Sequence, residues 1–212
     1  MVRPGLAYCI IEDQAVFLDL EADRYFRLNK GTTTAFLEAL TGEIKVDRTS
    51  PLILEAILVP ASDAPAIDAL SLGMPVTSLA IKEDGQIRLR WRLAALVVAV
   101  AVRLKLRINP NALMREGVKI NWLPDVGASD GDESLTMRVR AFYWAASALP
   151  VSLNCVCRSH GLKRLLSRDD IHLVIGVRLE PFLAHCWLQQ GSRVIGDDVD
   201  EVRAFTPITV IS

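Results

Sequence analysis

The first thirty residues alternate between apolar and polar positions, which predicts strands. The apolar run 8–11 ends at two acidic residues. From Gln14 to Leu20 we interpret the pattern as alternating, with Ala15, Phe17 and Asp19 on one side of a strand and Val16, Leu18 and Leu20 on the other. Residues 21–23 are typical of a turn, and residues 24–29 form the returning segment. Alternation with a period of two, interrupted by turn residues, is the pattern of paired strands. We therefore predict a small antiparallel meander of three strands.

Three helix signals follow this meander. The first helix is predicted to begin at Thr32 or Thr33, both good capping residues, and to end at Gly42. A Ser-Pro pair precedes the second, over residues 52–58, and Asp63 caps the third, which extends through Leu72. Three strands followed by three helices predict a small α+β domain.

Composition divides the chain into three predicted parts. Residues 1–80 form the α+β domain, residues 81–132 connect, and residues 133–212 form a second domain. The connecting part has a hairpin signal at 83–86 and an acidic, glycine-containing loop at 125–133. The second domain is predicted to contain helices 135–149 and 155–167 and strands 173–177, 182–188 and 193–197.

A basic stretch lies in the connecting part. Between Arg88 and Lys119 there are eight basic residues and one acidic residue, Glu116. The simplest interpretation is the solvated flank of a helix. The functional alternative is a surface that binds an acidic peptide or an acidic partner protein.

Charge and cysteine content narrow the function classes. The chain has 24 Lys and Arg against 25 Asp and Glu, whereas bulk nucleic-acid binding needs a basic excess. Four cysteines are too few for a disulfide scaffold and predict free thiols in a reducing compartment. The longest apolar run, residues 93–102, is shorter than the ~20 residues that span a bilayer, and no signal peptide is evident at the start. We expect a cytoplasmic protein without membrane or nucleic-acid partners.

Cysteine, histidine and aspartate occur in an order that indicates nucleophilic catalysis. If Asn154 caps its helix, Cys155 lies in the first turn, where the helix dipole and unpaired N–H groups favour the thiolate and an oxyanion. A three-residue turn at 190–192 would pair Gln189 with Arg193, so that His185 faces Asp197 at ~5 Å between Cβ atoms. These residues would be a nucleophile, a base and an orienting acid. The alternative is a structural cysteine on an apolar helix, which is the commoner case.

Four motifs in the same region resemble the C-terminal domain of the lasso-peptide B proteins. They are Cys155-Val156-Cys157-Arg158-Ser159, Ile175-Gly176-Val177-Arg178, Pro181-Phe182-Leu183-Ala184-His185-Cys186-Trp187 and Val194-Ile195-Gly196-Asp197. The family pattern is Cys-x-x-Arg-Ser, then Ile-Gly-Val-Arg, Ala-His-Ala-Trp and Asn-Asp. Cys186 and Gly196 depart from this pattern, and Asp198 leaves the acid open by one position.

This resemblance implies a leader peptidase with a transglutaminase-like, papain-like cysteine peptidase fold. Cys155 would be the nucleophile, His185 the general base and acid, and Asp197 the orienting acid, with no cofactor. By resemblance the leader is cut from the core of a precursor peptide. The freed amine of the core then goes to a partner, an ATP-dependent, asparagine-synthetase-like lasso cyclase.

The meander resembles a second module, the precursor-recognition element of ribosomal peptide biosynthesis. Residues 18–20 and 23–29 carry the resemblance, which extends over about residues 5–75. The element is winged-helix-like and also occurs as the peptide chaperone of pyrroloquinoline quinone biosynthesis. It implies that the leader adds as a strand beside residues 24–29 and lies against the third helix. The substrate-binding residues would be Arg24, Tyr25, Phe26, Arg27 and Leu28; the alternative is an ordinary hairpin in which Tyr25 and Phe26 pack into the core.

A metal site is not expected. Cysteines 155 and 157 lie two residues apart on a helix, so they diverge by about 200° and cannot both face one ion. Cys9, Cys157 and Cys186 are predicted to be small core residues, and His160 and His172 to be surface or hydrogen-bonded polar residues.

Two other classes of function remain open. A transglutaminase-like acyltransferase would use the same three residues but pass the acyl group to an amine. A catalytically inactive, peptide-binding scaffold is disfavoured because all three positions of the triad are occupied.

Overall fold

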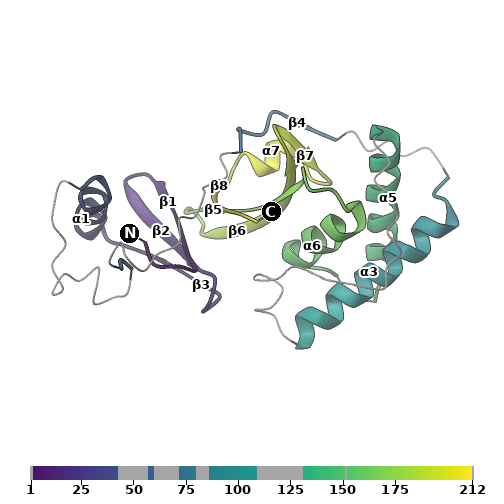
Figure 1. Ribbon diagram of the computed structural model, residues 1–212, viewed down its shortest axis with the longest axis horizontal. Coiled ribbons are helices and arrows are strands. Elements are labelled where there is room, and N and C mark those ends of the chain that lie inside the picture. The colour runs from purple at the N-terminus through teal and green to yellow at the C-terminus, as the bar shows by residue number, and fades with distance from the viewer. Residues whose placement is uncertain are drawn as a thin grey trace. The chain divides into compact units, whose positions relative to one another are not determined.

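The computed structural model describes residues 2–42, 57–59, 72–79, 86–108, 131–150 and 152–211. The chain divides into two compact units, Met1–Leu70 and Ser71–Ser212 (Figure 1). Both contain a sheet and at least one helix, so the chain is of mixed α+β class.

The first unit contains the predicted meander. Strands β1 (Leu6–Ile11), β2 (Gln14–Asp19) and β3 (Arg24–Arg27) pair antiparallel in the order β1-β2-β3. Phe17 at the centre of β2 is fully buried and packs edge-on against Phe36, with 5.1 Å between ring centroids. The predicted strands are thus confirmed, but β2 is buried on both faces from Ala15 to Asp19, so the predicted alternation does not mark one covered face.

Helix α1 (Lys30–Thr41) covers this sheet and ends at Gly42, as predicted. Its N-cap is Asn29 and not Thr32 or Thr33, because the Asn29 carboxamide oxygen accepts a hydrogen bond from the Thr32 N–H at 2.9 Å. Thr33 is buried instead and accepts a hydrogen bond from the Ala15 N–H of β2. The predicted cap was three or four residues late, although asparagine is the stronger N-cap residue of the two types.

The two further predicted helices of this unit are not seen as helices where the structure describes them. Leu58 forms an antiparallel bridge with Val2, so the end of the predicted helix 52–58 is extended. Residues 52–56 and 63–71 lie outside the described residues.

The second unit is built on a five-stranded sheet of order β4-β7-β6-β5-β8. The strands are β4 (Thr77–Ser78), β5 (His172–Arg178), β6 (Leu183–Gln190), β7 (Arg193–Ile195) and β8 (Thr206–Ile211). All pairs are antiparallel except β4 with β7. Strand β4 belongs to residues that the sequence analysis counts in the first domain, and β8 was not predicted.

Three long helices accompany this sheet. Helices α3 (Leu89–Ile108), α5 (Asp132–Ala148) and α6 (Cys155–Leu166) pack against one another, and α6 also contacts β5 and β6. A short helix, α7 (Val199–Val202), follows β7. Figure 1 shows α6 between the sheet and the α3–α5 pair. Among the helices that the structure describes, none has the length and apolar character needed to span a bilayer.

Two local predictions in this unit are corrected. Gln190 pairs with Arg193, so the β6–β7 turn has two residues and not three, with Gly191 at φ +55°. A residue at positive φ lets the chain reverse in fewer residues, and glycine adopts it without strain. Asp132 and Glu133 begin α5 and are not part of a loop. The predicted hairpin turn at 83–85 and loop at 125–130 lie outside the described residues.

Candidate active site

Cys155 is the first residue of α6. Asn154 is the N-cap, as predicted: its carboxamide oxygen accepts a hydrogen bond from the Cys157 N–H at 2.9 Å, and its backbone carbonyl accepts one from the Arg158 N–H. The half-buried thiol interacts with the His185 imidazole and with the backbone N–H groups of Cys186 and Val156. Burial raises the pKa of the Cys155 thiol, but these contacts outweigh it, and the pKa lies below its usual value.

His185 connects this cysteine to a carboxylate. It lies on β6 opposite Gly176, is 9% exposed, and its Nε2 is 2.8 Å from Oδ2 of Asp197. The hydrogen bond with Asp197, followed by the contact with Cys155, raises the pKa of His185 to about 9. A cysteine with a lowered pKa beside a histidine with a raised pKa favours a thiolate–imidazolium pair at neutral pH.

Asp197 reaches the imidazole from outside the strand ladder. The observed register, extended past Ile195, would place Asp198 opposite His185. However, β7 ends at Ile195, and Gly196 at φ +71° redirects the chain so that Asp197 points to the imidazole. The predicted partner is thus in contact with His185, although the predicted turn that led to it is wrong.

The Asp197 carboxylate is held by several donors. Its Oδ1 accepts a hydrogen bond from the Asp198 N–H at 3.0 Å, and Arg158 Nη2 lies 3.8 Å from Oδ2. Burial raises the pKa of the Asp197 carboxyl, but His185, the Asp198 N–H and Arg158 outweigh it, and the pKa lies below its usual value. The group is therefore an anion that both holds His185 and favours its protonated form.

Asp198, the neighbouring acid, has a different contact. Its side chain is the N-cap of α7 and accepts a hydrogen bond from the Asp200 N–H at 2.8 Å. The ambiguity between the two aspartates is resolved in favour of Asp197 as the residue that contacts the imidazole.

The turn that positions the Asp197 carboxylate is held by α5, a contact that the sequence does not predict. The Tyr143 hydroxyl donates a hydrogen bond to the Gly196 carbonyl, fifty-three residues away in sequence. A Cβ at Gly196 would lie 2.7 Å from Cδ2 of Leu162. Glycine and asparagine both adopt positive φ more readily than other residues, which explains why glycine fits where the family pattern has asparagine. No spacing signal links Tyr143 to this turn.

Two aromatic rings pack against the His185 imidazole. The Trp187 ring stacks on His185 with 6.2 Å between centroids, and the Phe205 ring lies at 5.2 Å. Trp187 is also 1% exposed, so the same ring lines the site and belongs to the core. A Cβ at Gly176 would lie 2.7 Å from the Trp187 ring, so glycine is required opposite His185.

The other cysteines and His160 lie in the core. Burial raises the pKa of Cys157 and Cys186, and raises that of Cys9 to about 11, so these three thiols stay protonated. His160 is 4% exposed, burial lowers its pKa to about 4, and its Nε2 has no hydrogen-bond partner in the described structure. The prediction of a surface or hydrogen-bonded His160 is therefore wrong. Within the described ranges no cluster of three His, Cys, Asp or Glu residues is arranged to hold a metal ion.

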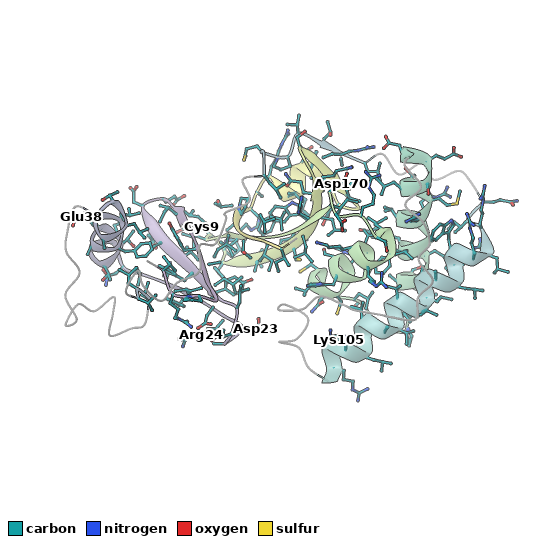
Figure 2. All side chains as sticks on the ribbon, in the orientation of Figure 1. Cys9, Asp23, Arg24, Glu38, Lys105 and Asp170 are labelled. Atoms are coloured by element: carbon teal, nitrogen blue, oxygen red, sulfur yellow. The ribbon has the colours of Figure 1, made fainter. Side chains whose placement is uncertain are left out.

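The predicted leader-binding residues lie on and beside β3. Strand β3 pairs with β2 only among the described strands, so its second edge has no partner strand there. Arg24 and Arg27 are exposed, and the Arg24 guanidinium lies over the Phe26 ring at 5.6 Å. Phe26 also stacks on Phe17 at 5.0 Å, and Leu28 is 6% exposed in the core. Figure 2 shows Arg24 beside Asp23 at the end of the β2–β3 hairpin.

The range 87–210 matches the family model of the transglutaminase-like superfamily. The chain belongs to the transglutaminase-like superfamily. The matched residues carry α3, α5, α6 and β5 to β7, and they include Cys155, His185 and Asp197.

This superfamily member is also similar to the microcin J25-processing protein McjB of Escherichia coli. The two are 52% identical over 46 residues, which is 21% of this chain and 22% of McjB. The chain thus matches about a fifth of the length of that relative. This similarity confirms the resemblance to the lasso-peptide B proteins. No solved structure matches the chain.

Proposed function

We propose that the protein is a leader peptidase of lasso-peptide biosynthesis that cuts by a Cys155–His185–Asp197 mechanism. The observation that carries the proposal is the position of His185. It is hydrogen-bonded to the Asp197 carboxylate on one side and in contact with the Cys155 thiol at the start of α6 on the other. The superfamily match and the name of McjB, a microcin-processing protein, support peptide processing as the activity.

The geometry supports the following order of steps. The Cys155 thiolate attacks the carbonyl carbon of the bond between leader and core, and the S–C bond forms. The C–N bond then breaks, and the core amine leaves with the proton of His185, which leaves the leader as a thioester. His185, now neutral, removes a proton from water, which attacks the thioester and releases the leader as a carboxylic acid. Asp197 holds the ring and stabilises the imidazolium.

Backbone N–H groups supply the oxyanion contacts in this scheme. The N–H groups of Val156 and Cys186 both interact with the Cys155 sulfur in the free protein. A carbonyl carbon bonded to this sulfur would bring its oxygen into the same region. Two backbone donors near a helix start are a common arrangement for stabilising such an oxyanion.

The first unit would bind the leader. Among the described strands β3 pairs with β2 alone, and a leader strand would add along its other edge. The backbone hydrogen bonds of an added strand depend little on the side chains of the leader. The β2–β3 turn next to this edge is fixed, because buried Asp19 accepts hydrogen bonds from Arg3 at 2.7 Å and from the N–H groups of Glu21 and Ala22. Arg24, Tyr25, Phe26 and Arg27 would contact the leader, and Leu28 would support the strand from the core. A winged-helix-like recognition domain is part of this proposal.

The reaction product determines the partner. Cleavage frees the amine of the core, which an ATP-dependent, asparagine-synthetase-like cyclase would join to an acidic side chain. The precursor peptide and this cyclase would meet the protein in the cytoplasm, and no cofactor is required.

The test is mass spectrometry of the precursor after incubation in water enriched in oxygen-18. The proposal predicts two products, core and leader, with one heavy oxygen in the new leader carboxylate. Cys155→Ala should abolish both, and Cys157→Ala, a buried cysteine two residues away, is the matched control. An amine adduct of the leader would mean acyl transfer, and an unchanged precursor would mean a scaffold; either result contradicts the proposal.

The recognition role is tested with fragments divided between the two units. Residues 71–212 keep β4 and the following Leu79, whose N–H donates to the Val194 carbonyl at 2.8 Å. This fragment should cut the precursor slowly and with raised KM, because it lacks the binding energy that concentrates the substrate. Residues 1–70 should bind the leader without cutting it. Full-rate cleavage by residues 71–212 with unchanged KM would remove the recognition role.

A further inference from the structure

Helix α3 is apolar on two opposite faces. The inner face, Trp91, Ala95, Val98 and Val102, is at most 3% exposed, and α3 packs against α5 and α6. The spacing of four, three and four residues places these side chains on one side of the helix. This face accounts for how α3 is held in the second unit.

The outer face carries a stripe of exposed aliphatic side chains. Leu89, Leu93, Val100 and Leu104 are 69%, 56%, 42% and 53% exposed. Leu93 and Leu104 each lie two residues beyond a member of the inner face, which turns them by about 200° around the helix. We call Leu89, Leu93, Val100 and Leu104 the outer stripe. It extends over four turns of a helix whose other side is already buried.

The charged residues of α3 itself all have one sign. The helix from Leu89 to Ile108 contains five basic residues and no acidic residue. Arg103 and Arg107 lie three residues after Val100 and Leu104, so each is next to the stripe on the helix surface. Lys105, labelled in Figure 2, lies on the same helix. The complementary surface is therefore apolar and bordered by carboxylates.

We propose that the outer stripe of α3 binds an amphipathic helix of another protein, with an apolar ridge flanked by Asp and Glu. The stripe is narrow and aliphatic, as in a helix–helix seam, and lacks the Trp and Phe that anchor interfacial helices in membranes. A second copy of α3 would bring basic flanks against basic flanks. An acidic partner is also the functional alternative that we gave for the basic residues between Arg88 and Lys119. This inference does not depend on the proposed cleavage reaction.

The test uses two synthetic peptides of equal length with leucines at heptad a and d positions. One has glutamate at the flanking e and g positions and the other has lysine, and both carry a fluorescent label. Fluorescence anisotropy with the full-length protein should show saturable binding of the glutamate peptide, at least about tenfold tighter than binding of the lysine peptide. Raised salt should weaken this binding.

The matched variants locate the binding. The double variant Leu93→Ser, Leu104→Ser should weaken the glutamate peptide about tenfold or more. Met74→Ser removes an apolar side chain that is 70% exposed outside α3 and should change nothing. Circular dichroism confirms that each variant is folded.

Four results would overturn the proposal. They are no binding of the glutamate peptide, equal binding of both peptides, equal loss in the Met74→Ser control, and self-association of the protein that Leu93→Ser abolishes. Phosphatidylglycerol vesicles are the last probe. Vesicle binding that depends on Leu93 and Leu104, without binding of the glutamate peptide, would assign the stripe to a lipid surface.

Discussion

His185 Nε2 lies 2.8 Å from Asp197 Oδ2, and this carboxylate is reached one residue after a glycine at φ +71° has ended the strand ladder. The position of the acid thus depends on a turn and not on strand pairing. The turn is held by the Tyr143 hydroxyl, which donates to the Gly196 carbonyl, and by Asp198, which caps the next helix.

Replacing the two adjacent aspartates should separate their roles. Asp197→Asn should lower kcat for precursor cleavage by about 10³–10⁴-fold, because an amide stabilises the wrong tautomer and cannot stabilise imidazolium. Asp198→Asn should keep kcat within a few-fold, because asparagine is an equally good N-cap. Leader binding should be unchanged in both. A larger loss of kcat in Asp198→Asn than in Asp197→Asn would mean that the wrong acid has been assigned.

The four thiols should differ in reactivity at neutral pH. Cys155 is half-buried with a lowered pKa, whereas burial raises the pKa of Cys9, Cys157 and Cys186. Iodoacetamide should therefore alkylate Cys155 first, as measured by peptide mass mapping over time. His185→Ala should slow this reaction, because the thiolate loses its partner. If Cys157 reacts as fast as Cys155, the nucleophile assignment is wrong.

The pH profile of kcat/KM should be bell-shaped. Activity rises as the Cys155–His185 pair loses its first proton and falls when His185, with a pKa of about 9, loses the proton needed by the leaving amine. The Asp197 hydrogen bond is the main cause of the raised pKa of His185. Asp197→Asn should therefore move the alkaline limb to lower pH. An alkaline limb that stays in place in this variant would contradict the account.

Two substitutions at Gly196 should differ in stability. A Cβ would contact Leu162 Cδ2 in both Gly196→Ala and Gly196→Asn, but asparagine tolerates positive φ better than alanine. We expect Gly196→Ala to lower the free energy of unfolding by about 1–2 kcal/mol, and Gly196→Asn to lower it less. Urea denaturation measures both. Equal losses would mean that the contact with Leu162, and not backbone conformation, selects glycine here.

The sequence predicts local features of this fold well where one pattern dominates. The meander follows from apolar segments separated by turn residues, and the start of α6 follows from Asn154 as its N-cap. At α1, Asn29 and two threonines are all candidate caps, and the stronger capping residue, Asn29, is the one that the structure uses. Strand β8 is missed because Pro207 weakens the strand signal; it lies at the register shift opposite Gly176.

The sequence predicts the candidate site by two sound arguments and one wrong one. Cys155 at a helix start and the motif resemblance are sound, since both depend on neighbours in the chain. The His185–Asp197 pair was reached through a three-residue turn that does not exist. Tyr143 and Leu162 shape this turn from distant helices, and no local pattern encodes such tertiary contacts.

The central claim is that Cys155 forms a thioester with the leader. Precursor and enzyme mixed in equal amounts and quenched in acid within one turnover should yield Cys155 carrying the leader, seen by peptide mass mapping as the leader mass less one water. His185→Ala, which lacks the base for hydrolysis, should not turn over. A leader adduct on any other residue, or continued leader release by Cys155→Ala, would contradict the account.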